Sequence, residues 1–135
     1  MIYLLDTNAV IKMLYGKHLS YVLKSFYDRK INLVYHAKIL KEYVEVAHRL
    51  KNQVPPERAR AFFVLLQEYG FEIKTLGKSP MLTDRDDEIF VQTLNSAELR
   101  GEKVALVTDN QKDFKNAKGL PLMTFQEFTL TLVQL

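Results

Sequence analysis

The sequence predicts an α/β protein: a single-domain, Rossmann-like α/β/α sandwich around a central, mostly parallel sheet of four to five strands. Three observations support this class. Short apolar runs alternate along the chain with longer stretches of helical periodicity, and this order is typical of a parallel sheet covered by helices. The short runs are apolar throughout, as expected of strands that are buried on both faces. The length of 135 residues fits one domain over residues 1–135.

The N-terminal part of the chain predicts one strand and two helices. Residues 2–5 form a short apolar strand. Asn8 is a favourable N-cap for the helix that follows, and Gly16 is a natural stop for it. A second helix is expected over roughly residues 19–28.

The middle of the chain predicts a second strand and two long helices. The strand covers residues 32–35, and apolar residues recur at helical spacing over residues 37–50. Pro55 and Pro56 break the chain and begin the next helix, whose apolar stripe ends at Gly70.

The C-terminal half predicts strands over residues 71–75, 103–107 and 120–123. Helices are expected over residues 87–100 and 125–135. One polar loop precedes the first of these helices, and a second polar loop follows the strand over 103–107.

Composition excludes several classes of protein. The chain has no cysteine, which excludes disulfide frameworks, thiolate metal sites and cysteine nucleophiles. No apolar run approaches the ~20 residues of a membrane span, and no basic segment followed by a long apolar one marks a secretory signal. We therefore expect a cytoplasmic protein that does not enter a membrane.

Acidic residues follow the strands or open the helices at one edge of the predicted sheet. Asp6 comes directly after the first strand, and Asp109 and Asp113 follow the strand over 103–107. The segment DRDDE, with Asp87, opens a helix, and Glu42 lies about two turns into the helix after the second strand. Since binding sites of parallel sheets form at the carboxyl ends of the strands, we expect these acids to share one site.

Carboxylates gathered in one cleft repel each other unless a cation or a proton lies among them. Hard oxygen ligands without cysteine or clustered histidine suit Mg²⁺ or Mn²⁺. With four site acids set aside, twelve of the 16 Asp and Glu residues remain against 19 Lys and Arg. An acidic pocket on a basic surface is suited to a polyanionic substrate.

Each acid also has a simpler explanation. Asp6, followed by Thr7 and Asn8, could serve only as a helix cap. The acids of DRDDE complement a helix dipole, and Glu42 could lie on a solvated face. The conjunction of acids at four such positions in one chain favours the shared site.

Four sequence blocks carry a resemblance to a known family. They are LLDTN (residues 4–8), ILKEY (39–43), DRDDEIF (84–90) and VTDNQKDF (107–114). In this order and at these separations they resemble the PIN-domain family, and most closely its VapC-like members, the toxin components of toxin–antitoxin pairs. The resemblance implies a PIN-like fold and a metal-dependent ribonuclease, an endonuclease that hydrolyses the phosphodiester bonds of RNA.

The resemblance also implies a set of site residues. The catalytic residues it implies are Asp6, Glu42, Asp87 and Asp109. The implied ligands of one or two Mg²⁺ or Mn²⁺ ions are Asp6, Asp87, Asp109 and Asp113. The polar residues that would orient the acids or waters are Thr7, Asn8, Thr108 and Asn110. Asp87 is preferred to Glu88 because Phe90 and Leu94 then fall on the core side of the helix.

The fourth block departs from the family pattern. Many members carry acids two and four residues after the threonine, whereas here Asp109 and Asp113 lie one and five residues after Thr108. Asp109 or Asp113 could supply the fourth acid, or Asn110 could ligate through its carbonyl oxygen.

Basic residues are expected to guide the RNA. Four of them bracket the proline break and the fifth lies in the fourth block: Arg49, Lys51, Arg58, Arg60 and Lys112. For most of them a solvated charged face is the simpler interpretation.

The implied partners are an RNA substrate, an antitoxin protein and a second copy of the chain in a homodimer. A phosphotransferase of the haloacid dehalogenase type requires a second aspartate at the position of Asn8, and a receiver module requires an aspartate after the strand over 71–75; neither is present. The remaining alternative is a catalytically silent PIN fold that acts as an RNA-binding or adaptor module.

Overall fold

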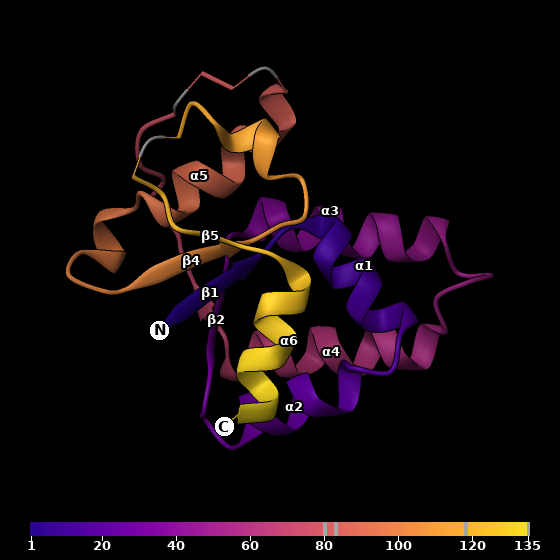
Figure 1. Ribbon diagram of the computed structural model, residues 1–135. Coiled ribbons are helices and arrows are strands. Elements are labelled where there is room, and N and C mark those ends of the chain that lie inside the picture. The colour runs from indigo at the N-terminus through magenta and orange to yellow at the C-terminus, as the bar shows by residue number, and fades with distance from the viewer. Residues whose placement is uncertain (80, 83, 118, 135) are drawn as a thin grey trace.

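Within the described residues, five parallel strands form one sheet in the order β3-β2-β1-β4-β5 (Figure 1). The computed structural model describes residues 1–79, 81–82, 84–117 and 119–134. The strands are β1 (Ile2–Leu5), β2 (Asn32–Tyr35), β3 (Phe71–Glu72), β4 (Val104–Val107) and β5 (Leu122–Met123). The predicted α/β class is confirmed, and the sheet is parallel throughout these strands.

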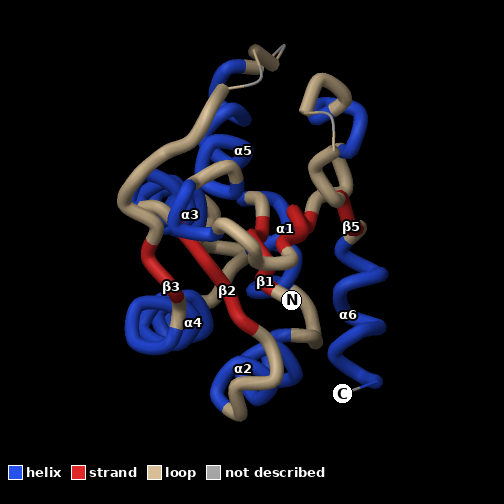
Figure 2. The backbone as a smooth tube through the Cα atoms, turned by 90° about the vertical axis from the view of Figure 1, so that its left-hand side faces the viewer, coloured by secondary structure: helices blue, strands red, loops and turns tan. Residues whose placement is uncertain are grey.

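Helices flank both sides of this sheet. The α-helices are α1 (Thr7–Tyr15), α2 (Leu19–Tyr27), α3 (Ala37–Arg49), α4 (Pro56–Tyr69), α5 (Glu88–Leu94) and α6 (Phe125–Gln134). Short 3₁₀ turns are η1 (Arg85–Asp87), η2 (Ala97–Leu99) and η3 (Gln111–Phe114). In Figures 1 and 2 the strands lie between α5 on one side and α2, α4 and α6 on the other. The structure is therefore an α/β/α sandwich.

The central strands carry the core and fix the position of the site. Leu4, Leu106 and Val107 are fully buried, as expected of parallel strands that are covered on both faces. Leu5 of β1 pairs with Val107 of β4. Because these two strands end in register, the residues that follow them emerge side by side at the carboxyl edge of the sheet.

The third predicted strand is shorter than expected. Residues 71–75 were predicted to be extended, but β3 ends at Glu72. The backbone N–H groups of Lys74 and Thr75 donate to the Glu98 carboxylate, at 2.8 and 2.7 Å. A side chain thus replaces the neighbouring strand as the hydrogen-bond partner.

The helix predicted over residues 87–100 is also interrupted. Helix α5 ends at Leu94, and Ser96 begins the separate turn η2 by accepting a hydrogen bond from the Glu98 N–H at 3.1 Å. The Asn95 side chain donates to the Lys78 carbonyl oxygen at 3.2 Å. A Ser side chain that bonds locally to the backbone competes with helix continuation, whereas the Asn95 bond ties the end of α5 to the loop that precedes this helix.

The remaining boundaries agree with prediction to within about two residues. Residue 135, which was predicted to end the last helix, lies outside the described residues. In the described part of the chain, no helix is both long and apolar enough to cross a membrane.

Candidate functional site

A cavity of about 300 Å³ lies at the carboxyl edge of the sheet. Its carboxylates are Asp6, Glu42, Asp84, Asp86, Asp87 and Asp113. The rest of the lining is Thr7, Asn8, Val46, Arg49, Phe90, Asn110 and Phe114. We call this site the acidic cavity. It joins segments that are far apart in the sequence: the ends of β1 and β4, one side of α3, and the start of α5.

Asp6 caps a helix and also lines the acidic cavity. Its Oδ1 atom accepts a hydrogen bond from the Ala9 N–H at 2.7 Å, so Asp6 is the N-cap of α1. The prediction that Asn8 caps this helix is wrong, because Thr7 already lies inside the helix and Asn8 lines the cavity. Burial raises the pKa of Asp6, while hydrogen bonds from Thr108 and Ala9 lower it in part.

Helix α3 is fixed to the end of β1 by Tyr43. The Tyr43 side chain is 1% exposed, and its hydroxyl donates to the carbonyl oxygen of Leu5. Burial raises the pKa of Tyr43, so the hydroxyl keeps its proton and remains a donor. The next residue back in the chain, Glu42, accepts a hydrogen bond from the Thr7 hydroxyl. Thr7 therefore orients Glu42, which is the kind of role the resemblance implies for it.

Asp87 lies in the field of the other carboxylates. Burial raises its pKa to about 6, and repulsion from Asp84, Asp113, Asp6 and Glu42 adds to the increase. The neighbouring Glu88 does not line the cavity. Its carboxylate accepts the Leu82 N–H at 3.0 Å instead. The structure thus places Asp87, and not Glu88, with the other site acids.

The two acids of the fourth block face different surroundings. Asp113 lines the acidic cavity. Asp109 is absent from the described lining, because one of its carboxylate oxygens accepts from Lys12 and the other accepts the Phe125 N–H at 2.9 Å. These hydrogen bonds lower the pKa of Asp109. Asp109 joins α1 and α6 to the β4 end, and its charge still helps to raise the pKa of Asp6. Asp113 is the acid of this block that lines the acidic cavity.

The two polar residues of the fourth block have different positions at the site. Thr108 is fully buried, hydrogen-bonds to Asp6, and accepts the Asn110 N–H at 3.0 Å. Asn110 itself lines the cavity.

The predicted RNA-binding residues separate into distinct groups. Arg49 lines the acidic cavity. Arg58 donates to the carbonyl oxygens of Leu14, at 2.8 Å, and Gly16, so it caps the end of α1. The other three are exposed side chains outside the cavity lining: Lys51, Arg60 and Lys112.

The donor set fits a hard divalent cation in its chemistry. Carboxylates and two amides gather in one cavity, and burial together with repulsion among the carboxylates raises the pKa of Asp87. A cation among them would relieve that repulsion. Among the residues that the structure describes, however, no group of three or more Asp, Glu, His or Cys side chains is close enough to form a ready-made ion site.

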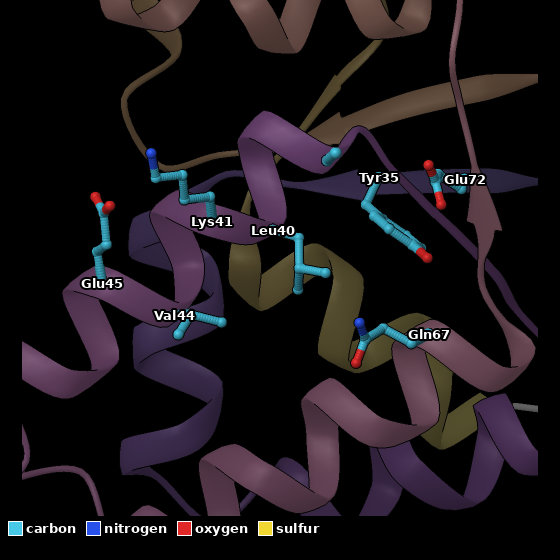
Figure 3. Close-up of a pocket in the computed structure, with 8 residues that line it drawn as sticks. Tyr35, Leu40, Lys41, Val44, Glu45, Gln67 and Glu72 are labelled. Atoms are coloured by element: carbon cyan, nitrogen blue, oxygen red, sulfur yellow. The ribbon is translucent and has the colours of Figure 1, made fainter.

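Two further hollows lie on the other side of α3, between α3 and α4. They have volumes of about 420 and 530 Å³ and share Val44 and Gln67. Figure 3 shows the first of them: Leu40 and Val44 of α3 face Gln67 of α4, while Lys41 and Glu45 extend outward. We call these two hollows together the α3–α4 groove.

The sequence reasoning did not identify two residues that position the site. Lys12 pairs with Asp109, and nothing in the sequence links residues 97 positions apart. Tyr43 lies within residues 37–50, where the helical spacing predicts only a core position for it. Its place beside Glu42 in the ILKEY block was the available signal.

The fold and the cavity together define a class: parallel α/β proteins with a cluster of acids at the carboxyl edge of the sheet. The model of the PIN-domain family matches residues 3–112, which is most of the chain. The chain belongs to the PIN-domain family. PIN domains are generally nucleases that use divalent metal ions, so membership indicates a nuclease-type function. No curated protein matches the chain.

Proposed function

We propose that the protein is a metal-dependent endoribonuclease that hydrolyses RNA at the acidic cavity. The observation that carries this proposal is the convergence of Asp6, Glu42, Asp87 and Asp113 on one cavity from separate segments of the chain. Family membership supports the nuclease class. The excess of basic residues outside the cavity supports a polyanionic substrate.

The acids of the site have two different roles in this proposal: three bind metal, and one positions the attacking water. Asp6, Asp87 and Asp113 would hold one or two Mg²⁺ or Mn²⁺ ions, and Asn110 would add a neutral oxygen. Such an ion would supply the positive charge that neutralises the phosphate and favours attack by water. Glu42, oriented by Thr7, would accept a hydrogen bond from the attacking water and align it with the phosphorus. Tyr43 keeps Glu42 at a fixed distance from β1.

A cleavage assay tests this proposal. The purified protein is incubated with single-stranded RNA in Mn²⁺, in Mg²⁺ and in excess EDTA. The Asp6→Asn variant should lose cleavage while its thermal unfolding changes little, because Asn is also a good N-cap. Full activity in Asp6→Asn, or in EDTA, would contradict the proposal.

The second candidate is a catalytically silent PIN fold that binds RNA or acts as an adaptor. Two observations favour it: the described acids do not form a ready-made ion site, and Asn110 occupies a position where many family members carry an acid. The two functions separate cleanly in one experiment. A silent module binds labelled RNA and leaves it intact in both Mn²⁺ and Mg²⁺.

The resemblance to VapC-like proteins supports three further proposals. The protein acts in the cytoplasm as the toxin of a toxin–antitoxin pair, its antitoxin covers the acidic cavity, and it forms a homodimer. Induced expression should then arrest growth in the wild type and not in Asp6→Asn. Light scattering during gel filtration gives the mass of the purified protein, and a monomer would contradict the homodimer.

A further inference from the structure

Helix α3 carries an acid and a cation along one side of the acidic cavity. Glu42, Val46 and Arg49 all line it, at the i, i+4 and i+7 positions that share one face of a helix. With a rise of about 1.5 Å per residue, the backbone positions of Glu42 and Arg49 are separated by roughly 10 Å along the helix axis. Glu42 and Arg49 therefore extend from different positions along the same wall of the cavity.

Arg49 is the one cation among the described residues of the cavity lining. Its side chain is exposed, and the ion pairs found in the described part of the chain join other residues, Lys12 to Asp109 and Lys24 to Asp28. The planar guanidinium can bind a phosphate with two parallel hydrogen bonds. Arg49 thus presents an unused phosphate-binding group at the rim of a cavity that otherwise repels phosphate.

The other cations of the same helical hairpin have different surroundings. Arg58 is occupied by the carbonyl oxygens at the end of α1. Arg60 and Lys51 line the α3–α4 groove, on the opposite side of α3 from the acidic cavity. Loss of Arg60 removes the same charge from the same hairpin without changing the cavity, so Arg60 is the natural control for Arg49.

We propose that Arg49 binds a phosphate that neighbours the cleaved one, so that the RNA strand runs along α3 with the scissile phosphate at the carboxylates. The proposal rests on the proposed function. It adds the direction in which the RNA runs across the protein and a minimum length for the RNA substrate. A substrate needs at least one phosphodiester beyond the one that is cut, on the side of Arg49. The contact acts in binding, so its loss raises KM more than it lowers kcat.

The test combines protein variants with single neutral linkages in the substrate. A short single-stranded RNA with one cleavage site is made with a methylphosphonate, which carries no charge, at each linkage near the cut in turn. In the wild type, one flanking linkage should lower kcat/KM by about tenfold when neutral, as expected for the loss of one charge-assisted hydrogen-bonded pair. In Arg49→Gln the same linkage should have no further effect, whereas Arg60→Gln should respond as the wild type does.

Salt dependence gives an independent reading. For a single strand, each phosphate contact contributes about 0.7 to the slope of log affinity against log salt concentration. Arg49→Gln should reduce that slope by about this amount. Arg49→Lys, which keeps the charge and loses the fork, should recover the slope and only part of the affinity.

Two results would overturn the inference: no flanking linkage loses its effect in Arg49→Gln, or Arg49→Gln and Arg60→Gln weaken binding equally. Fluorescence anisotropy with the same oligonucleotides, in the absence of divalent metal, separates this inference from the proposed function. If the wild type binds but cleaves nothing, the ribonuclease proposal fails. The linkage-specific effect on binding then supports or overturns the role of Arg49 by the same criteria.

Discussion

The two sides of helix α3 form hollows of opposite character. One side, with Glu42, Val46 and Arg49, faces the acidic cavity of about 300 Å³. The other side, with Leu40 and Val44, lines the α3–α4 groove, whose two parts are each larger, at about 420 and 530 Å³. The larger hollows are bordered mainly by apolar side chains and scattered charges of both signs.

This difference shows that chemistry identifies the candidate site better than size does. In the cavity, acids from distant segments line one space, and burial together with repulsion from Asp84, Asp113, Asp6 and Glu42 raises the pKa of Asp87. In the groove, Lys41 and Glu45 of α3 extend outward, and Glu72 of β3 lies apart from them beside Tyr35 (Figure 3). We therefore expect substitutions on one side of α3 to change catalysis and those on the other to leave it unchanged.

The largest expected effect is on cleavage. Asp87→Asn and Asp113→Asn should each reduce the rate of RNA cleavage at least about a hundredfold, because each removes a charged ligand from the acidic cavity. Glu45→Gln and Glu72→Gln remove the same charge from the groove and should stay within about twofold of the wild type. Initial rates of cleavage of one labelled RNA in Mn²⁺ are measured for all four variants. Equal losses of cleavage rate in the cavity variants and the groove variants would contradict the difference between the two sides of α3.

The second prediction separates the two acids of the fourth block. Asp109→Asn removes the charge that pairs with Lys12, and it weakens the hydrogen bond from the Phe125 N–H. We expect it to lower the free energy of unfolding by about 1 kcal/mol and to keep cleavage within about threefold of the wild type. Urea denaturation and the same cleavage assay check it. If Asp109→Asn abolishes cleavage while Asp113→Asn does not, our assignment of the fourth acid is wrong.

The third prediction concerns the pH dependence of stability in the absence of metal. The folded-state pKa of Asp87 is about 6, above its ordinary 3.8, so the folded protein holds a proton that the unfolded chain has lost between these values. Stability from this group therefore falls as pH rises from about 4 to above about 6.

Asp87→Asn removes this penalty. The variant should be more stable than the wild type at about pH 8, by on the order of 1 kcal/mol because solvent screens this partly exposed group. At about pH 4 the difference should vanish. Thermal unfolding of both proteins in EDTA at the two pH values measures this, and a gain that is equal at both would contradict it.

The smallest expected effect lies in the groove. Val44 is 45% exposed and borders both parts of it. Val44→Ala should change the free energy of unfolding by less than about 0.5 kcal/mol and leave cleavage unchanged, as expected of an exposed position. A large loss of cleavage would show that the groove takes part in the reaction.

The sequence predicted those strands and helices that neighbouring residues alone determine. Apolar runs with turn signals gave β1, β2 and β4, and the phase of the helix after DRDDE distinguished Asp87 from Glu88. Side-chain contacts between distant residues were not predictable. The Glu98 carboxylate accepts hydrogen bonds from the N–H groups of Lys74 and Thr75 beyond the end of β3, and Asp109 pairs with Lys12. Whether an acid near the end of a strand faces the site depends on its hydrogen-bond and ion-pair partners. Those partners are distant in the sequence, so the spacing of residues does not predict them.

The central claim is that Asp6, Asp87 and Asp113 form a site for divalent metal. Crystals of the protein soaked in Mn²⁺ test it most directly, since anomalous scattering locates the ion without reference to activity. We predict at least one Mn²⁺ ion in the acidic cavity, bound by carboxylate oxygens of Asp6 and Asp87, with Asp113 or Asn110 completing the site and Asp109 still paired with Lys12. An empty cavity at saturating Mn²⁺, or an ion bound to Asp109, would contradict it.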